Sequence, residues 1–90
     1  MHAVVTTITV NDPDAARSQM RENVVPGVSQ APGFVAGYWT GGGDGGGLSF
    51  VVFESEDAAK AISERIPSLL TDAVTVKKIE VREVVAHAGS

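Results

Sequence analysis

The strand-like segments of this 90-residue chain carry apolar side chains at both odd and even positions, and only two helix-like segments accompany them. Neighbouring side chains on a strand point to opposite faces of a sheet, so strands of this kind are apolar on both faces. Two helices can cover only one face of a four-stranded sheet. Burial of the other face against a second copy of the chain is the simplest remedy.

The order of the segments predicts one α+β domain over residues 1–90, arranged as strand–helix–strand–strand–helix–strand. The predicted strands are residues 2–10, 34–40, 48–54 and 74–87. The first helix is expected to begin after Asp12 and to end at Pro26-Gly27, with an apolar stripe of Ala16, Met20 and Val24. The second is expected to begin after Ser55 and to end or kink at Pro67, with Leu69 and Leu70 completing the core.

The sequence leaves two assignments of the sheet faces open. If Val4 and Ile8 face the helices, the uncovered face offers Val5, Val35, Val51, Phe53 and Trp39; the opposite assignment uncovers Ile8, Leu48, Phe50 and Val52. Either set makes an apolar patch larger than soluble monomers usually expose. We therefore expect a homodimer formed through the open sheet face and the last strand.

The last strand has an irregular apolar pattern. Its apolar phase slips by one residue near Lys77-Lys78, which predicts a β-bulge. Extended residues 74–87 would span roughly 46 Å, which is long for a domain whose radius of gyration should be about 12 Å. The strand is therefore expected to bend or to reach across to a second subunit.

Composition excludes several classes of function. The net charge of −4, with only seven Lys and Arg, argues against nucleic-acid or membrane-surface partners. The absence of cysteine excludes disulfides, thiolate metal sites and Cys nucleophiles. The sequence contains no signal-peptide pattern and no run of 18 apolar residues, so we expect a cytoplasmic protein.

Three segments carry a family resemblance: Pro32-Gly33-Phe34, the run from Val51 to Ala59, and the run from Val81 to Val85. With these segments the chain resembles the dimeric α/β-barrel superfamily and, within it, the antibiotic-biosynthesis-monooxygenase-like domains. The resemblance implies a ferredoxin-like βαββαβ protomer with a four-stranded antiparallel sheet. It also implies that the open sheet faces of two protomers meet to form a barrel.

Two branches of that family have chemistry. The haem-degrading branch uses an Asn in the first strand, a Trp in the second helix and a following His; this chain places Thr6 and Ile62 at the first two positions and has no His between His2 and His87. Haem degradation is therefore not expected. The other branch implies a cofactor-independent monooxygenase that acts on an aromatic or quinol-type compound. A non-catalytic ligand-binding or stress-response dimer, and a haem binder without the degrading residues, stay open as alternatives.

The candidate substrate-binding residues are Thr6, Tyr38, Trp39, Phe50 and Arg82, and no catalytic group is predicted. Tyr38 or Trp39 lines a pocket for a flat ligand, or both are packing residues. Thr6, like Ser49, lines a cavity or bonds to nearby backbone. Arg82 holds a substrate anion, or it points outward or pairs across the dimer.

Two other features are given structural interpretations. The segment Gly41–Gly47 lacks the Lys-Ser/Thr of a phosphate-binding loop and joins two strands, so we expect a flexible hairpin tip. His2 and His87 could lie side by side on neighbouring strands, but a metal site there would need a third ligand such as Glu83. We predict exposed histidines, no metal and no cofactor.

Overall fold

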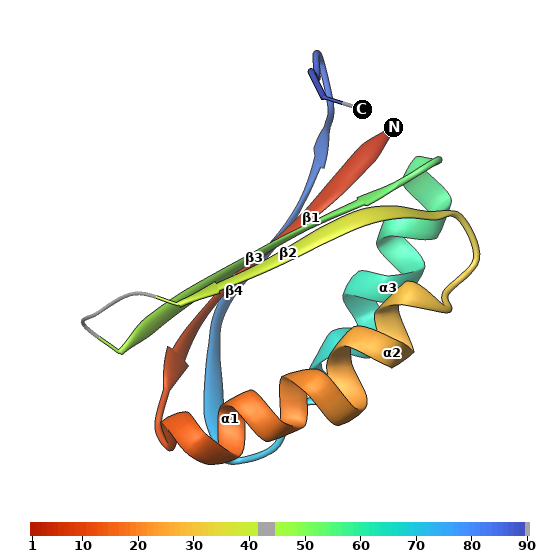
Figure 1. Cartoon of the computed structure of the whole chain (residues 1–90). Helices are drawn as coiled ribbons and strands as arrows, with labels where there is room; N and C mark the ends of the chain where they lie inside the picture. The colour runs from red at the N-terminus through yellow and green to blue at the C-terminus, as the bar shows by residue number, and fades with distance from the viewer. Residues whose placement is uncertain (42–44, 90) are drawn as a thin grey trace.

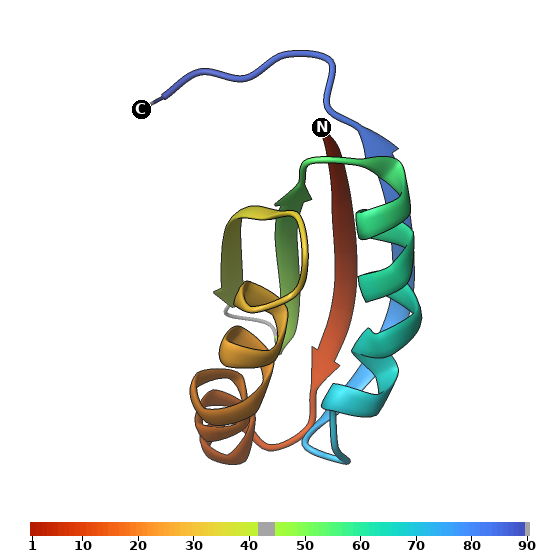
Figure 2. The ribbon, with the colours of Figure 1, turned by 90° about the vertical axis from the view of Figure 1, so that its right-hand side faces the viewer.

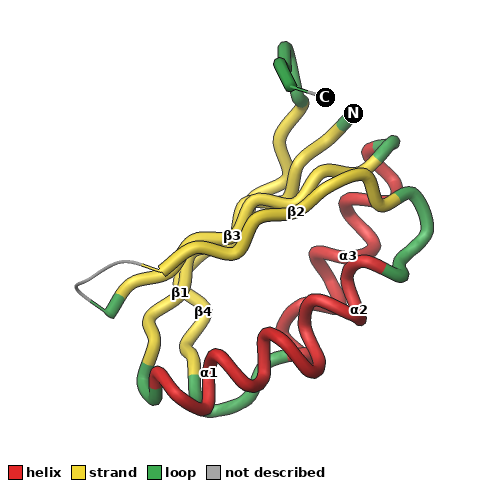
Figure 3. Tube along the Cα trace, viewed as in Figure 1, coloured by secondary structure: helices red, strands yellow, loops and turns green. Residues whose placement is uncertain are grey.

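The computed structural model describes residues 1–41 and 45–89 of the chain, as an antiparallel sheet with helices on one side (Figures 1 and 3). The strands are β1 (His2–Val10), β2 (Phe34–Gly41), β3 (Gly46–Phe53) and β4 (Val74–Glu83). The helical elements are α1 (Pro13–Gln19), the π-helical turn η1 (Met20–Val24), α2 (Val25–Ser29) and α3 (Glu56–Leu69). The four strands lie in the order β2-β3-β1-β4, which confirms the predicted βαββαβ arrangement.

All helices lie on the same face of the sheet. Figure 2 shows α3 beside β1 and β4, and the continuous helical segment α1–η1–α2 beside the β2–β3 side. Side-chain oxygens of Asp12 and Ser55 cap α1 and α3 by accepting hydrogen bonds from Ala15 N and Ala58 N. Both predicted helix starts are therefore confirmed.

The expected end of the first helix at Pro26-Gly27 is wrong, because helical structure continues to Ser29. Proline breaks a helix interior because it has no N–H and its ring clashes with the carbonyl four residues earlier. The π-helical turn η1 starts a new α-helical segment at Val25, so Pro26 falls in the first turn of α2. An N–H is not needed there, and the chain passes the proline without ending the helix. Pro67 is likewise followed by two more helical residues.

The predicted last strand is too long, because β4 ends at Glu83 and not at His87. Its partner β1 begins at His2, and the final backbone hydrogen bond runs from Val84 N to Met1 O at 3.0 Å. Beyond that point no described strand lies beside β4, and residues 84–89 turn away from the sheet (Figures 1 and 2). The predicted bulge is confirmed: Thr7 pairs with Lys78 and Ile8 with Val76, so the register skips Lys77.

The pairing register decides which face of the sheet the helices cover. Val4 is paired with Val51 and Val81, and all three lie on the helix side. The predicted grouping of Val51, Phe53 and Trp39 with Val5 is wrong, since Val5 is paired with Phe50 on the opposite face. The uncovered face instead exposes large apolar side chains of β2 and β3, namely Val35, Tyr38, Leu48 and Phe50.

The core lies between sheet and helices. Its central cluster contains residues from the sheet and from both helical segments. These are Val4, Val51 and Phe53 from the sheet, Val24 and Val28 from the first helical segment, and Ala59, Ile62 and Ile66 from α3. Leu69 and Leu70 pack against this cluster from its edge, as expected. Phe34 and Phe53 contact each other edge to face, with ring centroids 6.0 Å apart. Within the described ranges, no helix has the length and apolarity needed to span a membrane.

Candidate functional site

An open cleft lies between α1–η1 and the end of the sheet formed by β1 and the β2–β3 hairpin. Its volume is about 600 Å³, in the range of small-molecule sites. Most of its walls are apolar side chains from β1 and the first helical segment: Ile8, Val10, Pro13, Ala16, Met20 and Val25. The cleft also reaches Gly41, Gly45 and Gly46 of the predicted loop Gly41–Gly47; residues 42–44 of that loop lie outside the described residues.

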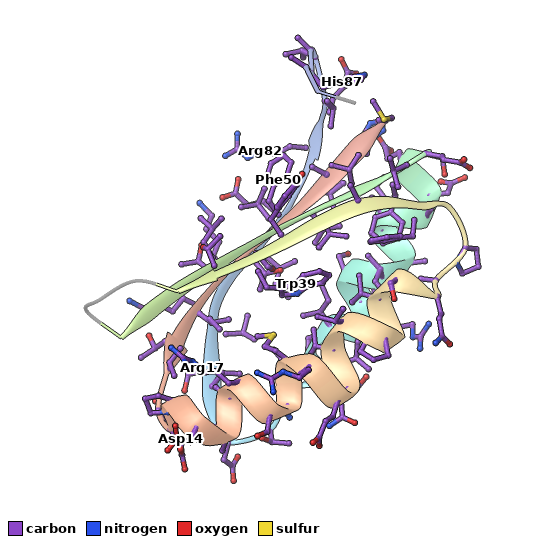
Figure 4. The ribbon with its side chains drawn as sticks, viewed as in Figure 1. Asp14, Arg17, Trp39, Phe50, Arg82 and His87 are labelled. Carbon is purple, nitrogen blue, oxygen red and sulfur yellow. The ribbon has the colours of Figure 1, made fainter. Side chains whose placement is uncertain are left out.

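Trp39 forms the aromatic wall of the cleft. It projects from β2 into the space between sheet and helices (Figure 4) and is half-buried. Its ring lies over Gly37, where a Cβ would come within 2.8 Å of the indole. The indole N–H donates to no other residue in the described ranges. Trp39 is therefore fixed on one side by the strand and presents its remaining surface to the cleft.

A small internal cavity of about 30 Å³ adjoins the cleft, and Ile8, Met20, Trp39 and Thr40 line both spaces. Thr6 and Ser49 are paired on β1 and β3, Ser49 is paired with Trp39 on β2, and all three line the cavity. The Thr6 hydroxyl is buried and makes no hydrogen bond to any described residue. The cavity has about the volume of one water molecule, and the Thr6 hydroxyl can bind a small polar group there.

The other three predicted site residues lie on the opposite face of the sheet. Tyr38 and Phe50 are paired across β2 and β3, and their exposed fractions are 68% and 39%. Arg82 is paired with Ala3 on that face and forms an ion pair with Glu80 (Figure 4). The predicted set thus separates into Thr6 and Trp39 beside the cleft, and Tyr38, Phe50 and Arg82 on the uncovered sheet.

The charges on that open face form a local cluster. Glu80 accepts from Lys78 Nζ at 2.9 Å and pairs with Arg82. The hydrogen bond from Lys78, together with that from Arg82, lowers the pKa of Glu80 below its ordinary value. Arg82 is therefore engaged by a residue of its own strand, which agrees with the interpretation of these charges as strand-surface pairs.

The prediction of exposed histidines is wrong for His2, whose side chain is only 20% exposed. His2 is paired with Glu83 in the sheet, and its Nε2 lies 3.3 Å from Glu56 Oε2. His87 lies in the segment beyond β4 (Figure 4). No group of three His, Asp or Glu side chains arranged to hold a metal ion occurs in the part of the chain that the structure describes.

Sequence analysis missed Arg17 and Arg21, which line the helical side of the cleft. Their spacing of four residues places them on one side of the helical segment, and this spacing was the available signal. The signal is weak by itself, because exposed helix positions usually carry charges. Only the fold shows that these two positions border an apolar cleft.

The fold defines the chain as a ferredoxin-like α+β domain, and two solved structures share it over nearly the whole length. One is a mutant of MhuD with two manganese protoporphyrin IX molecules bound per active site; it is 17% identical, with a TM-score of 0.74 and full coverage of both chains. The other is a monooxygenase from the gene ActVA-Orf6 of Streptomyces coelicolor in complex with Nanaomycin D. It is 20% identical, with a TM-score of 0.58 and coverage of 99% of this chain and 92% of that chain.

These neighbours bear out the resemblance to antibiotic-biosynthesis-monooxygenase-like domains at the level of the fold, with an open four-stranded sheet and helices on one face. No family model matches the sequence, and a search of curated proteins found no match. At 17% and 20% identity the likeness shows the fold alone, so activity and ligand have to be argued from the site.

Proposed function

We propose that this chain is a cofactor-independent, monooxygenase-like enzyme that binds an aromatic or quinol-type compound in the cleft beside Trp39. The observation that carries the proposal is the cleft itself: about 600 Å³, mostly apolar, with one aromatic wall. A flat aromatic ring stacks favourably on an indole, and the apolar walls remove part of the ring's surface from water. The shared fold with a monooxygenase seen in complex with Nanaomycin D supports the same function.

The reaction can be balanced without a protein-bound redox group. A hydroxyarene with an unsubstituted ring position gives four electrons to O₂. One oxygen atom becomes the new carbonyl oxygen of a quinone, and the other leaves as water. The substrate itself, once deprotonated to the phenolate, is the reductant. The Thr6 hydroxyl lines the small cavity beside the cleft, and it can donate a hydrogen bond to a phenolate oxygen that reaches this cavity.

The substrate phenol has to lose its proton before it can reduce O₂, either to a protein base or in solution. The described residues that line the cleft include no carboxylate and no imidazole. We therefore propose that the substrate enters as the phenolate, so the rate should rise with pH through the pKa of the phenol and not through that of a protein base. The absence of a base among these residues also favours a second candidate, a dimer that binds aromatic compounds without turning them over.

Haem is a poor fit for the residues of this site. The two histidines of the chain are His2 and His87, and neither lines the cleft or the cavity. Ile62, the position where the resemblance places a Trp, is 2% exposed and packs in the core. We assign no step to haem.

Oxygen uptake with a panel of phenols and quinols tests the proposal. We expect one O₂ consumed per quinone formed and no hydrogen peroxide, checked by adding catalase. Trp39→Phe should slow turnover, because a smaller ring covers less of the substrate. Tyr38→Phe is the matched control, since Tyr38 lies on the opposite face of the sheet.

Three results would contradict the enzyme. Oxygen consumption by none of the panel would leave only the binding function, and equal effects of the two aromatic substitutions would remove the cleft as its site. A peroxide yield equal to the oxygen consumed would indicate simple quinol autoxidation.

We also propose that the chain forms a homodimer through the uncovered sheet face. A row of paired residues crosses all four strands on this face: Tyr38, Phe50, Val5 and Glu80. Its β2–β3 half is apolar and exposed, and its β4 half carries both signs of charge on Lys78, Glu80 and Arg82. A twofold-related copy would cover the apolar β2–β3 half and leave the charged side chains of β4 near the rim of the interface. The exposed segment 85–89 follows the last strand of the same sheet and is accessible to the partner.

A further inference from the structure

Two arginines stand at the rim of the cleft, and neither has a partner among the described residues. Arg17 in α1 and Arg21 in η1 both line the cleft, and Figure 4 shows Arg17 on the side of α1 that faces the sheet. Neither guanidinium forms an ion pair or a side-chain hydrogen bond with a residue of the ranges 1–41 and 45–89. By contrast, Arg82 on the opposite face is held by Glu80. The arginines of the cleft are thus available to a ligand.

The charged side chains beside the cleft are positive, whereas the chain as a whole carries a negative net charge. The net charge of the whole chain is −4, yet the charged residues among the described lining of the cleft are these two arginines. The neighbouring acid Asp14 lies on the far side of α1 and points away from the sheet (Figure 4). A positive rim on an apolar cleft in an acidic protein attracts an anion locally while the rest of the surface repels it.

We propose that the cleft binds an aromatic carboxylate, with the ring against Trp39 and the carboxylate held by Arg17 and Arg21. A guanidinium presents paired N–H donors that match the two oxygens of a carboxylate. Arg17 and Arg21 are four residues apart, so both can donate to one carboxylate, and we call this pair the carboxylate fork. The apolar walls from Met20, Val10 and Val25 accept the ring system. This inference rests on the proposed aromatic-ligand function and names the substrate class as hydroxylated aromatic acids.

The test compares 4-hydroxy-1-naphthoate with 1-naphthol, which lacks the carboxylate. Binding is measured by calorimetry and by the indole N–H resonance of Trp39, the single tryptophan of the chain. The parent should bind the acid roughly tenfold more tightly than the neutral compound, a modest factor because both arginines are exposed. Added salt should reduce the preference. Arg17→Gln and Arg21→Gln should each reduce it, with a larger loss of affinity for the acid than for 1-naphthol.

Arg65→Gln is the control, because Arg65 is an exposed arginine on α3 that does not line the cleft. Circular dichroism establishes that each variant is folded. Equal affinity of the parent for the two compounds, or the same loss in the Arg65 variant as in the cleft variants, overturns the inference. If 1-naphthol alone shifts the Trp39 resonance, the aromatic site stands and the carboxylate fork fails. If neither compound shifts it, both proposals fail.

Discussion

The indole of Trp39 lies over Gly37, two residues earlier on the same strand, in contact that only a glycine allows. A Cβ at position 37 would come within 2.8 Å and 2.9 Å of two ring carbons of Trp39. The missing side chain thereby fixes where the aromatic wall of the cleft stands. The cleft depends on this pair as much as on the residues that line it.

Gly37→Ala should displace Trp39 from the strand and toward the cleft. We expect a loss of about 1–3 kcal/mol in the free energy of unfolding from overpacking, a shift in the tryptophan emission, and weaker binding of aromatic compounds. Gly41→Ala is the control for stability and emission, because a Cβ there meets no described residue within 4 Å. Identical stability and emission in the two variants would show that the contact does not hold the ring in place.

Phe50→Glu should separate the proposed dimer. Phe50 is paired with both Tyr38 and Val5 near the centre of the uncovered face, where a buried unpaired carboxylate is strongly unfavourable. Sedimentation should give twice the 9.3 kDa chain mass for the parent and the single chain mass for the variant. Ala61→Glu places the same charge on the exposed side of α3 and should leave the dimer intact. A parent that sediments as a single chain contradicts the proposed dimer.

Ser55→Ala should reduce the free energy of unfolding by about 1 kcal/mol, because the N-cap of α3 loses its side-chain acceptor. The Ser55 hydroxyl accepts from Ala58 N at 3.1 Å. Ser63→Ala is the matched control within α3, since the Ser63 hydroxyl only donates to Lys60 O and alanine favours the helix. Urea denaturation measures both, and equal effects would rule out the cap as the cause.

The Glu80 cluster predicts a contribution to stability that is lost in acid. Because hydrogen bonds from Lys78 and Arg82 lower the pKa of Glu80 in the folded chain, the contribution is complete above the unfolded-state pKa of about 4.3. It disappears as the pH falls through the lower folded value. In Glu80→Gln, the free energy of unfolding should therefore fall less steeply than in the parent over this acid range.

Glu83→Gln removes a carboxylate of the same strand that has no ion pair among the described residues. It should keep the acid dependence of the parent. A Glu80 variant with the same pH slope as the parent would contradict the assignment to this cluster.

The fold could be predicted from local signals, and the site only in part. The capping residues Asp12 and Ser55, the strand patterns and the phase slip at Lys77 act over a few residues, so sequence reveals them. The pairing of Val4 with Val51 is a long-range choice of register, and a shift by one residue would reverse every face of the strand. For that reason the sequence alone does not separate Thr6 and Trp39 from Tyr38 and Phe50.

The same limit explains the two largest errors around the site. Pro26 suggests a helix end unless the preceding turn is π-helical, and no local residue pattern marks that turn. Arg17 and Arg21 look like ordinary exposed charges until the hairpin end is placed opposite them. Residues that are near in space but far in sequence define this cleft, and no local pattern marks them.

The central claim is that aromatic ligands bind on the helix side of the sheet, beside Trp39. Backbone and indole NMR spectra recorded during a titration with 1-naphthol test it most directly. We predict chemical-shift changes at Ile8, Met20, Trp39 and Thr40, which line both the cleft and the internal cavity. Changes centred instead on Tyr38 and Phe50 of the uncovered face, or no changes at all, would contradict it.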